Sequence, residues 1–176
     1  IKITARPLKV DTGSDTRAYN GEYLSCKSFT VTYAGDKVGQ TNAFINDGED
    51  LSIVGSLPKI INVGKKENAI GFAVPNGNYY LDETKTQNGV LEITPAEITV
   101  TLSDVSCDYG DKLPAPAYTL QVSGKYGAGL FGGDTFTPAF LYDGAQSTRL
   151  NIGTHGITLD KANCAFGYGN SETVTE

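Results

Sequence analysis

The sequence predicts a mostly β protein that consists of two copies of one small module. Three observations support this prediction: short segments alternate apolar and polar residues, glycine is abundant, and the two halves of the chain match each other. The 176 residues include 21 Gly and 7 Pro, which are the residues that mark turns between short strands. Because no long segment shows helical periodicity, we expect about five short strands per module and little helix.

The two halves of the chain match in three pairs of segments that occur in the same order. These pairs are residues 3–10 (ITARPLKV) with 93–100 (ITPAEITV), 29–35 (FTVTYAG) with 118–124 (YTLQVSG), and 61–64 (INVG) with 150–153 (LNIG). The offset is 90 residues for the first pair and 89 for the other two. Self-similarity at a fixed offset indicates a repeated structural unit, so we place the first module at residues 1–95 and the second at residues 96–176.

Local patterns predict the strands of each module in order. The segments LKV and ITVTL alternate apolar and polar residues with a period of two, which is typical of a half-buried strand. The segments FTVTY and YTLQV follow them and are rich in β-branched and aromatic residues, which favour strands. Asn76-Gly77 and Asn88-Gly89 are turn signals. Pro95 fixes its own φ angle, which suits a stiff junction between the two modules.

The stretch Asp11-Thr12-Gly13-Ser14 follows an apolar alternation, as the catalytic loop of an aspartic protease does. Such a protease needs two carboxylates that share one proton. At the offset of 90 residues the stretch corresponds to residues 101–104 (TLSD), so the second module contains no Asp-Thr-Gly. A dimer would still supply two loops, but here the motif lies in one copy of a duplicated module. We therefore expect no enzyme, and aspartic protease stays as a third hypothesis only.

Composition disfavours several other classes of function. The net charge of −6 opposes binding to the phosphate backbone of nucleic acids, and no apolar stretch is long enough to span a membrane. Three scattered cysteines and the single His155 do not form a zinc-binding pattern, so we expect no metal and no cofactor. The acidic loop at 46–50 lacks the spacing of a calcium loop, and the glycine-rich segment at 124–134 lacks that of a phosphate-binding loop.

Four tyrosines are candidates for contact with a ligand: Tyr79, Tyr80, Tyr126 and Tyr142. Exposed tyrosine rings can stack on sugars, but tyrosine is also the usual half-buried residue of small β modules. The absence of tryptophan weakens the sugar interpretation without excluding it.

The order of the short motifs resembles that of MBG-type modules, the "mostly β-grasp" tandem repeats of bacterial surface proteins. The matching motifs are Ile3-Thr4, YNG (19–21) and YGD (109–111), FTVTYAG and YTLQVSG, GEDL and GDTF, NVG and NIG, NYY, and LEITP (91–95). Two features depart from the family pattern: NCAF replaces Asn-Tyr in the second copy, and cysteines are present. The resemblance covers nearly the whole chain. It implies two tandem β-grasp-like modules, an extracellular location at the cell surface and no catalytic residues.

The β-grasp-like fold implied by this resemblance also suggests a disulfide. In such sheets the first and last strands are central neighbours. Cys107 ends the first-strand segment of the second module, and Cys164 lies in a late strand. We therefore expect a disulfide between Cys107 and Cys164, and a free thiol at Cys26.

Two functional hypotheses remain. The first is a structural or spacer segment of a large secreted or cell-surface bacterial protein, of the adhesin-stalk type, with neighbouring modules of the same chain as partners. The second is a binding module for a host glycan, mucin or protein, which should expose an aromatic or apolar patch. The chain opens in the middle of a pattern at Ile1, and almost no spare residues separate the modules around Pro95. We therefore expect a fragment of a larger exported protein whose modules stack end to end.

Overall fold

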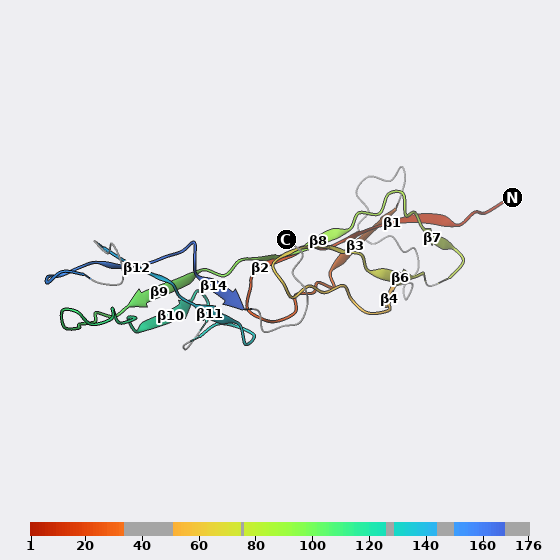
Figure 1. Cartoon of the computed structure of the whole chain (residues 1–176). Helices are drawn as coiled ribbons and strands as arrows, with labels where there is room; N and C mark the ends of the chain where they lie inside the picture. Colours follow the sequence, from red (N-terminus) through yellow and green to blue (C-terminus); the bar gives the residue numbers. More distant parts are fainter. Residues whose placement is uncertain (34–50, 75, 126–128, 144–149, 168–176) are drawn as a thin grey trace. The chain divides into compact units, whose positions relative to one another are not determined.

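The computed structural model describes residues 1–33, 51–74, 76–125, 129–143 and 150–167 (Figure 1). These residues contain short strands and no helix, which confirms the predicted mostly β class for the part of the chain that is described. Backbone contacts divide the chain into two compact units, residues 1–95 and residues 96–176.

The described residues of the first unit form eight strands. They are β1 (Arg6–Thr12), β2 (Asp15–Ala18), β3 (Phe29–Tyr33), β4 (Ser52–Val54), β5 (Gly64–Asn68), β6 (Gly71–Ala73), β7 (Tyr79–Leu81) and β8 (Gly89–Thr94). Strands β1 and β2 belong to one nearly continuous segment that is interrupted only at Gly13 and Ser14. This segment takes part in both three-stranded sheets of the unit.

The first-strand segment has different partners along its length. Strand β1 lies between β3, which is antiparallel to it, and β7, which is parallel to it (Figure 1). Strand β2 pairs in parallel with β8, and β8 pairs antiparallel with β5 on its other side. A separate antiparallel pair is formed by β4 and β6. The last strand, β8, is therefore a parallel neighbour of β2, the second part of the first-strand segment.

Strand alternation builds a small core in the first unit. Leu8 and Val10 of β1 are at most 1% exposed, and they pack with Leu51 and Tyr79. A second cluster contains Leu24, Leu91 and Ile93, with half-buried Tyr19, Cys26 and Ile60 packed against it. Burying one aliphatic side chain of this size contributes about 1.5–3 kcal/mol, so these few side chains supply much of the driving force for folding.

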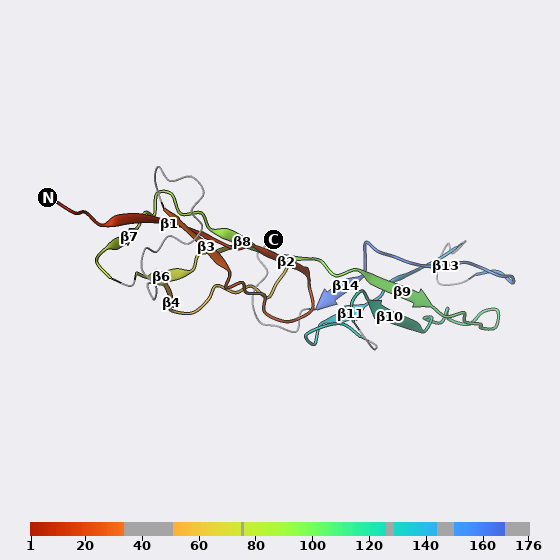
Figure 2. The same cartoon turned by 180° about the vertical axis from the view of Figure 1, so that it is seen from behind.

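The described residues of the second unit form six strands. They are β9 (Ile98–Leu102), β10 (Tyr118–Val122), β11 (Thr135–Thr137), β12 (Phe140–Tyr142), β13 (Ile157–Leu159) and β14 (Ala165–Gly167). They pair antiparallel as β9 with β10, β11 with β14, and β12 with β13 (Figures 1 and 2). Among the described residues of this unit, only Pro116 and Val122 are buried, so its core is much thinner than that of the first unit.

The first strand pair is the same in both units. In β1 and β3, Val10 lies opposite Val31. In β9 and β10, Val100 lies opposite Leu120. Val100 and Leu120 are the positions that the repeat offsets of 90 and 89 residues assign to Val10 and Val31. The register of this pair therefore agrees with the repeat read from the sequence.

The late strands differ between the two units. The segment NYYL contributes β7, which pairs with β1. Its sequence counterpart NCAF leads into β14, which pairs with β11 instead. Within the described residues, β9 therefore pairs with β10 alone, whereas β1 has partners on both edges.

Candidate functional site

The Asp-Thr-Gly-Ser stretch lies where β1 passes into β2. The Asp11 carboxylate is 2.7 Å from Lys9 Nζ and accepts a hydrogen bond of 3.2 Å from the backbone N–H of Gln87. Its side chain is 32% exposed. Asp11 is thus a partly exposed carboxylate that is paired with a lysine, which does not match a pair of carboxylates sharing a proton.

The two hydroxyl groups of this stretch bind backbone groups of neighbouring strands. Thr12 Oγ1 donates to Asn68 O at 2.7 Å and accepts from the N–H of Gly89 at 2.8 Å. Ser14 Oγ accepts from the N–H of Val90 at 2.9 Å. The hydroxyls therefore connect the β1–β2 junction to the ends of β5 and β8. These hydrogen bonds stabilise the packing of the β1–β2 junction against β5 and β8.

Asn68 is the centre of this polar junction. Its side chain is fully buried, and Nδ2 donates to Gly13 O at 2.8 Å and to Cys26 O at 2.9 Å. Its Oδ1 atom is buried and has no hydrogen-bond partner among the described residues. A buried acceptor without a partner costs about 1–3 kcal/mol, so the two donated hydrogen bonds must offset this penalty.

Gly89 completes the junction because the backbone of Gly13 passes very close to it. A Cβ atom at position 89 would lie 2.7 Å from Thr12 O and still closer to the carbonyl group of Gly13. Real Cβ contacts are essentially never that short. Only glycine therefore allows β8 to begin at this point.

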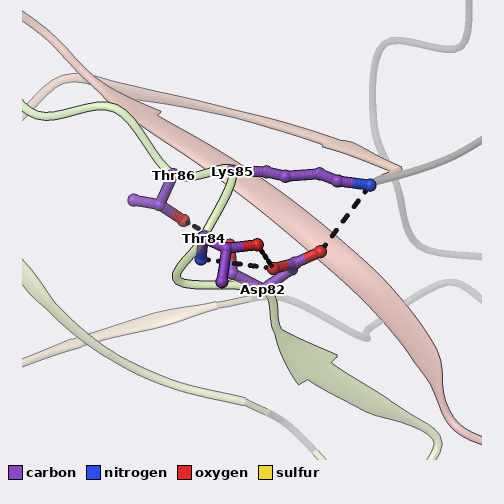
Figure 3. Close-up of polar contacts among 4 residues, drawn as sticks. All are labelled: Asp82, Thr84, Lys85 and Thr86. Atoms are coloured by element: carbon purple, nitrogen blue, oxygen red, sulfur yellow. Dashed lines mark hydrogen bonds and ion pairs between the residues drawn. The ribbon is translucent and has the colours of Figure 1, made fainter.

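A second polar cluster caps the turn after β7 (Figure 3). Asp82 Oδ1 accepts from the N–H of Thr84 at 3.2 Å and from its hydroxyl at 2.5 Å, and Oδ2 lies 3.8 Å from Lys85 Nζ. Asp82 O accepts the N–H groups of Lys85 and Thr86. An aspartate that binds the backbone two residues later is a common turn stabiliser.

The same turn recurs in the second unit. Asp160 O accepts the N–H groups of Asn163 and Cys164 at 3.1 Å each, and Asp160 Oδ2 accepts from Asn163 Nδ2 at 2.8 Å. The segments LDETKT and LDKANC therefore form turns with the same backbone hydrogen bonds after β7 and β13, although they do not correspond in the repeat. Both aspartates accept hydrogen bonds that stabilise these turns.

The four candidate tyrosines do not form one surface. Tyr79 is only 6% exposed and belongs to the core of the first unit, so its prediction as a ligand-facing residue is wrong. Tyr80, the next residue along β7, is 49% exposed. Tyr142 is half-buried and donates to Pro114 O at 2.7 Å. Tyr126 lies outside the described residues.

The predicted disulfide between Cys107 and Cys164 is not formed, and all three cysteines are free thiols. Strand β9 pairs with β10 and β14 pairs with β11. The first and last strands are therefore not neighbours within the described residues of this unit. The Cys164 thiol lies instead 3.1 Å from Asp160 O, in the turn described above. Cys26 Sγ lies 3.0 Å from Ser28 Oγ.

The remaining polar candidates also bind backbone atoms. The ring nitrogens of His155 lie 3.2 Å from Asp143 O and 2.8 Å from Asn151 O. In the glycine-rich segment, Lys125 Nζ donates to the carbonyl groups of Gly129 and Leu130. Across the described residues, no group of three or more His, Cys, Asp or Glu side chains is placed to hold a metal ion. The acidic loop at 46–50 lies outside them.

A partly exposed aromatic cluster was not among the sequence candidates. Phe136 of β11 lies directly opposite Phe166 of β14, with ring centroids 5.0 Å apart. The ring of Tyr118 in β10 lies edge-on to the ring of Phe136, with the ring centroids 6.1 Å apart. Tyr118 is 36% and Phe166 is 50% exposed. The sequence repeat could have predicted this cluster. Tyr118 and Phe136 correspond to Phe29 and Leu51, which pack in the core of the first unit.

The comparisons with known proteins identify no relative. No protein-family model matches the chain, and neither a search of curated proteins nor a search of solved structures found a match. No helix in the described part of the chain could cross a membrane.

Proposed function

We propose that this chain is a structural spacer segment of a secreted or cell-surface bacterial protein, of the adhesin-stalk type, with no catalytic activity. Its units are two tandem β-grasp-like modules, and its partners are neighbouring modules of the same chain. The motif order that resembles MBG-type repeats supports this proposal. The bacterial and extracellular parts of the proposal rest on that resemblance alone.

The observation that carries the proposal is the repeated register of the first strand pair. Val10 lies opposite Val31 and Val100 lies opposite Leu120, although the two pairs share only the pattern of apolar residues and little identity. A protein that repeats one module reuses a fold, and arrays of repeats commonly serve as extended scaffolds. The parallel pairing of β2, in the first-strand segment, with the last strand β8 supports the β-grasp-like part of the proposal.

The polar residues of the first module support a non-catalytic role. Thr12, Ser14 and Asn68 all bind backbone groups of adjacent strands. Asp11 is paired with Lys9. An aspartic protease would instead present an aspartate to a second aspartate and a water molecule, so that third hypothesis has little support.

The spacer function predicts an elongated particle in solution. Only three residues, Pro95 to Glu97, separate the end of β8 from the start of β9, and a short linker that contains proline restricts the angle between modules. Small-angle X-ray scattering on the 176-residue chain should give a radius of gyration well above the value of about 16 Å for a compact domain of this length.

A matched control is a variant with ten Gly and Ser residues inserted after Pro95. Because such a linker behaves as a flexible coil, the scattering curve should lose the features of a single elongated shape. A radius of gyration near the compact value for the unmodified chain would contradict the spacer proposal. It would favour two units that close on each other.

The alternative function is binding to a host glycan, mucin or protein. The observation that favours it is the cluster of Tyr118, Phe136 and Phe166, which exposes aromatic rings on the second unit. The equivalent positions Phe29 and Leu51 contribute to the core of the first unit, so the cluster is also explained by a thin core. Loss of a ligand on Phe166→Ala would distinguish the binding module from the spacer.

A further inference from the structure

The outer edge of β1, which faces away from β3, has partners at two places in the first unit: β7 lies against residues 6–8, and Gln87 binds Val10 and Thr12. The N–H of Arg6 donates to Asn78 O at 2.7 Å, and the N–H of Asp82 donates to Leu8 O at 2.9 Å. Farther along, Gln87 and β1 exchange two hydrogen bonds, from Thr12 N to Gln87 O at 3.0 Å and from Gln87 N to Val10 O at 3.2 Å. The even-numbered residues of β1 therefore face a parallel partner.

The corresponding edge of β9 has no partner among the described residues. Ser123 N donates to Glu97 O and Ser103 N donates to Ala117 O, so the odd-numbered residues of β9 direct their backbone groups toward β10. In an antiparallel pair the intervening residues direct theirs to the other side. The backbone groups of residues 98, 100 and 102 thus form an open edge, at the positions equivalent to 8, 10 and 12.

The apolar side chains at this edge are also incompletely covered. Ile98 and Val100 are half-buried, whereas their counterparts Leu8 and Val10 are at most 1% exposed. In the first unit, Tyr79 of β7 covers this part of the core and is itself 6% exposed. The described residues of the second unit therefore leave both a backbone edge and an apolar face without a partner where the first unit has β7.

The sequence of β9 gives this edge no protection. Natural edge strands usually carry a charged residue, a proline or a bulge that prevents pairing with another chain. The segment ITVTL has none of these and is regular along its whole length. An unprotected regular edge favours the addition of a further strand.

We propose that the outer edge of β9 binds an extended peptide segment of a partner protein, which adds as a parallel strand. The register of β7 on β1 defines the chemistry of this segment. It needs free backbone groups at alternate positions, and a large aromatic or aliphatic residue at the position of Tyr79, directed toward Ile98 and Val100. This binding function is additional to the spacer role and does not depend on it.

The test uses the complete chain and a peptide with the sequence of residues 76–82 (NGNYYLD), which is the segment that occupies this edge in the first unit. In an NMR titration, we expect saturable shifts of the amide signals of Ala96, Ile98 and Val100, because residues 79–81 pair with residues 6–8 in the first unit, which correspond to residues 96–98. A peptide with Tyr79→Ala should bind at least about tenfold more weakly, because it lacks the anchoring ring. A peptide with Tyr80→Pro should not bind, because proline lacks the N–H on the pairing edge.

The matched protein variant is Val100→Pro. The N–H of Val100 points away from β10, so proline should preserve the pairing of β9 with β10 and block the outer edge. Unchanged amide chemical shifts in β10 would verify that the variant is folded. If the variant does not fold, the Tyr79→Ala and Tyr80→Pro peptides still test the same edge in the unmodified chain. Peptide binding should weaken at least about tenfold in Val100→Pro.

Three results would overturn the proposal. The first is the absence of shifts in β9, and the second is equal binding by the wild-type and Tyr80→Pro peptides. The third is strong protection of the Val100 amide from hydrogen exchange in the free chain. Protection that is independent of protein concentration would mean that the chain's own residues occupy the edge, and protection that rises with concentration would mean that a second copy does. Scattering reports on the spacer role separately, so either proposal can fail alone.

Discussion

Replacing Asn68 with Ala is expected to destabilise the first unit by about 2–3 kcal/mol. The substitution removes the two hydrogen bonds that Nδ2 donates to Gly13 O and Cys26 O. The loss of each of these part-buried hydrogen bonds costs about 1–1.5 kcal/mol. Urea unfolding followed by circular dichroism, with NMR signals of the first unit as a local probe, measures the change in the free energy of unfolding.

Asn68→Asp separates hydrogen bonding from packing. Aspartate has nearly the same shape, but it directs an oxygen atom instead of an N–H group at the two carbonyls, so we expect a larger loss of about 4 kcal/mol. The control is Asn88→Ala, because Asn88 is exposed and its Nδ2 donates to the exposed carboxylate of Glu67 at 3.0 Å. This control should change stability by less than about 0.5 kcal/mol. Equal changes in the free energy of unfolding at positions 68 and 88 would show that the hydrogen bonds of Asn68 do not stabilise the fold.

Replacing Gly89 with Ala is expected to destabilise the first unit by about 3 kcal/mol. The added Cβ atom would overlap with the backbone of Thr12 and Gly13, and a backbone cannot yield as a flexible side chain can. Overpacking of this kind typically costs about 1–3 kcal/mol. The hydrogen bond from Gly89 N to Thr12 Oγ1 should weaken as well, so hydrogen exchange at Gly89 and Val90 should accelerate together.

Gly77→Ala is the matched control for Gly89→Ala. Both glycines follow an asparagine in the same unit, but a Cβ atom at position 77 would meet nothing within 4 Å. We expect a change of less than about 0.5 kcal/mol at position 77. A Gly89→Ala variant as stable as Gly77→Ala would mean that β8 does not approach the β1–β2 junction so closely.

These two glycines also show what local sequence patterns could predict. Asn76-Gly77 forms the expected turn, in which Asn76 Oδ1 accepts the N–H of Asn78 at 2.8 Å. Asn88-Gly89 has the same turn signal but begins β8. The difference arises from the close approach of Gly13, which lies 76 positions earlier in the chain and cannot be read from the dipeptide.

The first strand of each unit was predictable because its signal is local. Alternation of apolar residues places Leu8 and Val10 on one face of β1, and the structure buries both. The same property of strands explains why Tyr79 and Tyr80, which are consecutive in β7, cannot both face one ligand. Neighbouring residues of a strand point to opposite faces, and here one is buried and the other exposed.

Asn68 was not predictable from its local sequence. It ends the polar run Lys65-Lys66-Glu67-Asn68, in which the three preceding residues are exposed. Its burial arises from tertiary contacts with Gly13 and Cys26, more than 40 residues away. The late strands of the second unit were unpredictable for a related reason, because β14 pairs with β11 and not with β9, and this choice of partner is a tertiary contact that the local sequence does not encode.

The central claim is that the two units repeat one module, and cross-strand NMR contacts test it most directly. Val10 with Val31 and Val100 with Leu120 are non-hydrogen-bonded pairs, whose Cα atoms lie about 4.5 Å apart. We therefore expect strong nuclear Overhauser contacts between the Hα protons of both pairs. A register shifted by one residue in either unit, or the absence of the contact between Val100 and Leu120, would contradict the duplicated module.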